Sequence, residues 1–249
     1  MIQNDVIGDA NLTQFTGFFE RSQDYSYNEA KRQLRLALEE LRSRNRLIDA
    51  KLINPTATGR GAITGKEATE VWDFLHLTKT PHDAAFTQYP HLTLGIGQER
   101  LEAMLTIPNS LNTTAKNRLK HLGEAGFEEV CGQVLDNFSS VFSIENEAAP
   151  FMRGIQRRYR SQRDTKPHID ALIEFDLRTI TNGQGPKNQH QWLAALYDVF
   201  SNRNSNYQIQ IGAVFRYDLC KTIGTADALI LIEETWCACQ PIIDIIFDE

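Results

Sequence analysis

Cysteine is scarce in this 249-residue chain, and the few cysteines are scattered. The four are Cys131, Cys220, Cys237 and Cys239. Four thiols at these positions are too few and too far apart for a disulfide framework, and they lack the paired Cys or His spacing of a zinc site. Reduced thiols in a cytoplasmic protein are therefore our expectation.

A leader segment and long apolar runs are also lacking. The first ten residues contain Asp5 and Asp9 and have no basic stretch followed by an apolar one, so we expect no secretory signal. The longest apolar stretch, 226–247, is interrupted by acids and a proline, among them Glu233, Glu234, Pro241 and Asp244. Such a stretch predicts no membrane span, and we expect no membrane partner.

Positive charge is in deficit, because 26 Lys and Arg face 32 Asp and Glu and the net charge is −6. A protein that binds polyanions over its whole surface is normally basic, so any nucleic-acid role must depend on a local patch. Internal repeats, low-complexity tracts and linker-like stretches are absent. We therefore expect one domain over 1–249, with a helical region at about 1–80 and a sheet-containing core at about 81–249.

The apolar residues that are present change period along the chain. Three- and four-residue spacing predicts helices at 27–50, 66–77, 113–121, 124–138, 189–202 and 225–236. Two-residue alternation predicts a hairpin of 89–96 with 101–107, and further strands at 168–180 and 207–215. The stretch 242–247 fits a helical turn or a closing strand. This mixture, without regular strand–helix alternation, predicts an α+β fold of helices packed on a largely antiparallel sheet.

The strongest functional signal is a basic run in this acidic chain. It spans 153–166, with Asp164 as its one acid, and its candidate binding residues are Arg153, Arg157, Arg158, Tyr159, Arg160, Arg163 and Lys166. Arginine binds phosphate oxygens in two-point geometry, and an adjacent tyrosine ring can stack on a base. The alternative is a solvated helix or loop whose arginines pair with the protein's own carboxylates.

Two short motifs place a histidine at the start of an alternating strand. They are His-Leu-Thr at 91–93 and His-Ile-Asp at 168–170. Two histidines that face each other across strands can act as acid and base on a phosphodiester. The motifs resemble the paired His-x-Thr/Ser motifs of the two-histidine phosphoesterase family, although Asp170 stands where a hydroxyl is expected. The resemblance covers these stretches alone and implies catalytic roles for His91, Thr93, His168 and Asp170.

Three carboxylates follow in the second of these strands. Asp170, Glu174 and Asp176 share one face by alternation, and such a cluster can hold Mg²⁺ as in metal-dependent nucleases. The polar side of a half-exposed strand produces the same string without any function.

We therefore expect an accessory or recognition protein that binds a phosphate-rich partner, nucleic acid in the first place, through the arginine-rich run. No cofactor is expected in that role. The alternative is a phosphodiesterase or nuclease that uses His91 and His168, or Mg²⁺ at Asp170, Glu174 and Asp176. A third class is an interaction protein whose basic face docks on an acidic protein partner.

Overall fold

The computed structural model of the chain describes residues 24–56, 70–81, 86–97, 99–108, 113–141, 148–158, 168–176, 197, 207–225 and 227–247. The helices among these residues are α1 (Asp24–Ser43), α2 (Asn45–Asp49), α3 (Thr113–Val141), α6 (Ala228–Ala238) and α7 (Gln240–Phe247). The described residues also include two short 3-10 helices, η2 (Phe86–Gln88) and η3 (Thr222–Gly224). The strands are β1 (Glu70–His76), β2 (His91–Gly97), β3 (Arg100–Ile107), β4 (Ala149–Arg158), β5 (His168–Asp176) and β6 (Tyr207–Arg216).

These six strands form one sheet in the order β1-β2-β3-β6-β4-β5. Every neighbouring pair is antiparallel, which confirms the α+β fold with an antiparallel sheet. The predicted hairpin is confirmed as β2 and β3, and the predicted strand at 207–215 is confirmed as β6. β6 lies between β3 and β4, so the middle of the sheet joins segments that are about 100 residues apart in the chain.

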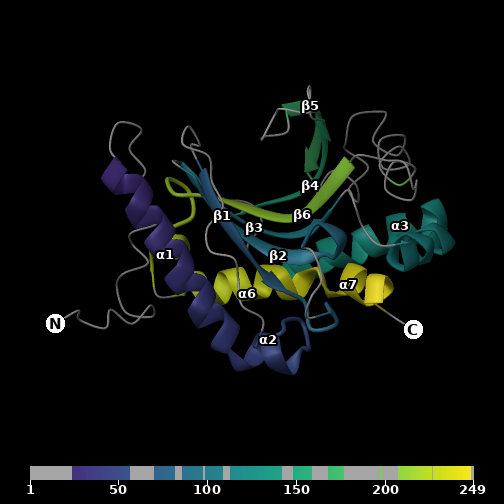
Figure 1. Cartoon of the computed structure of the whole chain (residues 1–249), viewed down its shortest axis with the longest axis horizontal. Helices are drawn as coiled ribbons and strands as arrows, with labels where there is room; N and C mark the ends of the chain where they lie inside the picture. Colours follow the sequence, from purple (N-terminus) through teal and green to yellow (C-terminus); the bar gives the residue numbers. More distant parts are fainter. Residues whose placement is uncertain are drawn as a thin grey trace.

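One face of the sheet is apolar and covered by helices. Figure 1 shows α6 and α7 lying along this face, with α1 at the β1 side and α3 at the opposite end. The strands present fully buried side chains to the helices, among them Leu92, Leu105, Ile211 and Met152. α1 contributes Leu34, Ala37, Leu38 and Leu41 at helical spacing. Burial of this amphipathic stripe against the sheet is what holds α1 in place.

Two of the helical regions contain a break. The chain is extended at Arg44, with φ −75° and ψ 127°, so the expected helix over 27–50 is α1 followed by the short α2. In α3 the break is at Gly123, where φ is +72°. A glycine adopts this left-handed conformation without the steric cost that other residues have, and the predicted separation of the two helical segments there is confirmed.

The C-terminal stretch is helical throughout. α6 ends at Ala238 and α7 begins at Gln240, which places Pro241 in the first turn of α7, where a proline needs no hydrogen-bond partner for its nitrogen. The open choice for 242–247 is thus decided in favour of helix. α7 is tied to the body of the protein by Arg118, which donates to the Ile246 carbonyl over 2.8 Å.

The prediction of a helix over 66–77 was wrong for its described residues, because 70–76 form β1. Val71, Asp73 and Leu75 point to the helices and Phe74 points to the other face. In so short a run, the spacing of Val71, Phe74 and Leu75 fits a helix as well as a strand. Pairing with β2 decides between the two. The N-terminal region up to residue 80 therefore contributes a strand to the sheet as well as α1 and α2.

The arginine-rich run begins inside the sheet. β4 pairs with β5 as a hairpin, and the register moves from Gln156–Ala171 to Arg157–Ile169. This shift leaves Asp170 as an extra residue on β5, a β-bulge that interrupts the expected alternation over 168–180. Residues 177–180 lie outside the described residues, as does the expected helix at 189–202 except for Tyr197. No helix in the described portion of the chain is long and apolar enough to span a membrane.

Candidate functional site

The face of the sheet opposite the helices carries a row of polar side chains that crosses all six strands. Each residue is the direct cross-strand partner of the next. From β1 to β5 this polar row consists of His76, His91, Thr106, Gln210, Arg153 and Glu174. The side chains are directed to the same face because residues directly opposite each other on neighbouring strands project from the same side of the sheet.

Most of this row is buried. His91 and Thr106 are 3% exposed, Gln210 is 7% exposed and Arg153 is 8% exposed. Burying a polar group is unfavourable unless it finds hydrogen-bond partners, and burying a charge is more unfavourable still. These buried polar side chains therefore need hydrogen-bond or ion-pair partners within the protein.

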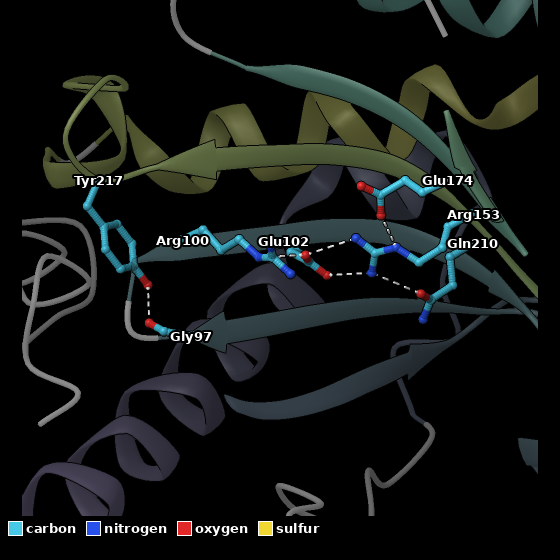
Figure 2. A network of polar contacts seen from close by, with 7 residues as sticks. All are labelled: Gly97, Arg100, Glu102, Arg153, Glu174, Gln210 and Tyr217. Carbon is cyan, nitrogen blue, oxygen red and sulfur yellow. Dashed lines mark hydrogen bonds and ion pairs between the residues drawn. The ribbon is translucent and has the colours of Figure 1, made fainter. Parts of the chain in front are cut away.

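Arg153 is the centre of these interactions (Figure 2). Its two terminal nitrogens donate to the two carboxylate oxygens of Glu102 over 3.1 Å each, and one of them also reaches the Gln210 Oε1 at 3.3 Å. Its Nε donates to Glu174. Arg100 binds the same carboxylate of Glu102, with its Nε 2.9 Å from Oε1. Two arginines and two glutamates thus form one chain of ion pairs with no net charge.

The electrostatic state of Arg153 follows from these neighbours. Burial alone lowers the pKa of an arginine, but the hydrogen bonds and negative charge of Glu102, with those of Glu174, outweigh burial and leave the pKa of Arg153 raised. Phe151, two residues earlier in β4, places its ring under the guanidinium at 4.4 Å from Cζ to the ring centroid. Arg153 is therefore a permanent cation held in one orientation.

The other end of the row lies at β1 and β2. His91 is at hydrogen-bond distance from the Tyr89 carbonyl through Nδ1, at 3.1 Å, and its ring lies 4.8 Å from that of Phe74. Since a carbonyl can only accept, Nδ1 carries the hydrogen in this contact. Thr93 and Thr106 share a hydrogen bond of 2.7 Å between their hydroxyls. Both residues of the His91–Thr93 motif are thus buried in contacts within the sheet.

The two histidine motifs are not brought together. His91 is in β2 and His168 is at the start of β5, four strands away in the sheet. At about 4.8 Å per strand this separation is about 19 Å, too far for both rings to act on one phosphate. His168 pairs with Arg158 beyond the β-bulge, so its register also differs from that of the polar row.

The three candidate metal ligands of β5 are also separated by their positions in the hairpin. Glu174 is engaged by Arg153, Asp176 is the cross-strand partner of Phe151, and Asp170 is the extra residue of the β-bulge. Within the described residues, no three His, Cys, Asp or Glu side chains are grouped so that they could hold a metal ion.

The arginine-rich run is divided by its position in the hairpin. Arg153 pairs with the protein's own carboxylates, as the alternative interpretation of the run expects. Arg157 and Arg158 continue β4 to the end of the hairpin, opposite Ile169 and His168. The other members, Tyr159, Arg160, Arg163 and Lys166, lie in the connection between β4 and β5, outside the described residues.

Several residues of this site were not predicted as site residues from the sequence, among them His76, Glu102, Thr106 and Gln210. Glu102 and Thr106 alternate with buried leucines, which marked them as the other side of a strand. The signal that would have identified them is burial of that second side, and it depends on strand order and register. No protein-family model matches the chain, and no curated protein matches it in sequence.

Proposed function

We propose that the chain is a recognition protein that binds a phosphate-rich partner, nucleic acid in the first place, through the end of the β4–β5 hairpin. The observation that supports this most concerns the first residue of the basic run: Arg153 pairs with the protein's own carboxylates, and the other basic residues follow it in the chain. Glu102 and Glu174, carboxylates on the polar face beside β4, are both engaged by Arg153. The remaining basic residues of the run follow Arg153 toward the hairpin end.

The hairpin end concentrates charge in a way that does not help folding. From 157 to 166 the sequence has five basic residues and one acid. Like charges so close together in the sequence repel one another, and this repulsion disfavours the compact fold. A charge density that is unfavourable for the fold is favourable for binding an anion, because phosphate oxygens offset the repulsion.

Single-stranded nucleic acid is the partner that this composition favours. Tyr159 lies among the arginines in the sequence, and aromatic rings bind unpaired bases by stacking while the cations follow the phosphates. Three basic residues elsewhere in the described part of the chain are already engaged by acids: Arg44 by Glu233, Arg46 by Glu234 and Arg216 by Asp218. A basic segment on an otherwise acidic molecule favours one binding orientation.

The test is a fluorescence anisotropy titration with labelled single-stranded RNA, single-stranded DNA and duplex DNA. We expect the variant Arg157→Glu/Arg158→Glu/Arg160→Glu to lose binding while its thermal unfolding stays close to that of the wild type. A matched control, Arg35→Glu/Arg216→Glu/Lys221→Glu, changes the net charge by the same amount at exposed positions elsewhere and should retain most of the affinity.

Two results would contradict the proposal. Binding that is unchanged in the first variant would exclude the hairpin end, and equal loss in both variants would show an effect of net charge only. Salt-sensitive binding to polyglutamate but not to nucleic acid would select an acidic protein partner instead. The same oligonucleotides, analysed on a denaturing gel with and without EDTA, should remain intact; cleavage in either condition would favour the enzyme class.

A further inference from the structure

The guanidinium of Arg153 is held on two edges by two carboxylates that differ strongly in exposure. Glu102 takes both terminal nitrogens, and its side chain is 3% exposed. Glu174 takes Nε, and its side chain is 44% exposed on β5, the last strand of the described sheet.

This difference in exposure decides which of the two carboxylates a ligand could displace from Arg153. Glu102 cannot leave Arg153 without leaving a charge buried and unpaired, which is strongly destabilising. Glu174 can return to water, because a half-exposed ion pair contributes little to stability and its carboxylate is readily hydrated. The Nε edge is therefore the replaceable side of this site.

The donor left behind would keep its place. The ring of Phe151 lies under the guanidinium, and Glu102 and Gln210 hold its far edge. A phosphate oxygen accepts a hydrogen bond from an arginine Nε as a carboxylate does, and a donor already fixed in orientation loses little entropy on binding.

Arg153 also belongs to the strand that leads to the hairpin end. Arg157 follows four residues later in β4, a distance of about 13 Å along an extended strand. A phosphate at Arg153 would thus continue a line of phosphates from the arginines of that end.

We propose that the Nε edge of Arg153 is a phosphate subsite, in which Glu174 occupies the position of the phosphate until the partner displaces it. The identity of the natural ligand rests on the function proposed above, but the subsite itself can be tested with inorganic phosphate. Glu174 would set the affinity of the site by competing with the phosphate for one donor.

The direct test follows the Nε–H resonance of Arg153 by ¹⁵N NMR while inorganic phosphate is added, with Arg153→Lys used to assign the resonance. In Glu174→Gln we expect a saturable shift at phosphate concentrations that leave the wild-type resonance little changed. Asp176→Asn, which removes the same charge two residues away on β5, should behave as the wild type. An Arg153 resonance that does not move in Glu174→Gln would overturn the proposal.

A second measurement uses the single-stranded RNA of the binding assay. We expect Glu174→Gln to bind about two- to fivefold more tightly than the wild type, the equivalent of one partly exposed ion pair. Asp176→Asn should gain less than half of that factor, and an equal gain in both variants would contradict the subsite. If no form binds RNA, the proposed function fails, and the phosphate titration still decides the subsite independently.

Discussion

Two rows of side chains cross the sheet one residue apart along the strands. One row is polar, and the other, on the opposite face, is apolar. Next to the polar row lies the row Leu75, Leu92, Leu105, Ile211 and Met152, which faces the helices. The apolar row lowers the free energy by leaving water, and other apolar side chains of similar volume would serve it. The polar row is also buried over its four middle strands, and burial is tolerated there because its members find hydrogen-bond and ion-pair partners within the row and beside it.

The comparison teaches where stability and function are to be sought in this molecule. Replacing a buried ion pair by apolar residues is often neutral or stabilising, so a row of this kind is not required for folding. Its position beside an arginine-rich strand end agrees with the proposed role in binding an anion. Three predictions, from the largest expected effect to the smallest, test whether the two faces differ in this way.

The largest effect is expected from Arg153→Met. Removing the cation leaves Glu102 buried with half of its partners, so we expect the free energy of unfolding to fall by about 3–5 kcal/mol in urea denaturation. The double variant Arg153→Met/Glu102→Gln removes the stranded charge and should regain more than half of the loss. If the loss of stability in the double variant equals the sum of the losses in Arg153→Met and Glu102→Gln, the two residues contribute independently.

A smaller effect is expected at the two threonines of the polar face. Thr106→Val leaves the Thr93 hydroxyl buried without its partner at 2.7 Å, which should lower the free energy of unfolding by about 1–2 kcal/mol. Thr93→Val/Thr106→Val removes both hydroxyls and should be close to the wild type. Calorimetric unfolding of the wild type, the two single variants and the double variant measures this. Losses that add strictly would contradict the view that the polar side chains serve a purpose other than stability.

The smallest effect is expected at Asp73, the polar exception on the helix-facing side. Burial raises the pKa of its carboxyl, against the hydrogen bond from the Phe74 amide and the charge of Arg42, which lower it. A raised pKa in the folded state means that protonation stabilises the fold below the unfolded pKa, and that this contribution is lost as pH rises through the folded pKa. Relative to Asp73→Asn, the wild type should therefore lose stability as pH rises from about 4, the unfolded pKa of an aspartate, and level off above the folded-state pKa.

The measurement for Asp73 is the difference in the free energy of unfolding between the two proteins across that pH range. A difference that stays constant with pH would show that the carboxyl does not titrate differently in the folded state. A wild type that gains stability as pH rises would show that Arg42 outweighs burial.

Local periodicity was sufficient to predict much of the fold. The β2–β3 hairpin, β6, the two segments of α3 and α6 follow from spacing within each segment, which depends on short-range geometry. β1 was assigned as a helix because Val71, Phe74 and Leu75 suit either period. β4 was not predicted as a strand, since its arginines and Gly154 concealed the alternation.

The candidate site could be predicted only in part. His91, Thr93, Arg153 and Glu174 were all singled out from the sequence, and all four face the same side of the sheet. Their arrangement depends on β6 lying between β3 and β4, which brings Gln210 and Glu102 to Arg153. Strand order is a long-range property, and neither composition nor spacing indicates it.

The most direct test of the account is the salt dependence of RNA binding, measured for the wild type and for single variants. For single-stranded RNA, the slope of log K against log salt should fall by about 0.7 for each phosphate-binding cation that a substitution removes. We predict this decrease for Arg157→Gln and for Arg158→Gln, but not for Arg216→Gln, whose side chain is held by Asp218 at the far end of β6. Equal slopes in all four proteins would contradict a phosphate-binding role for the end of the β4–β5 hairpin.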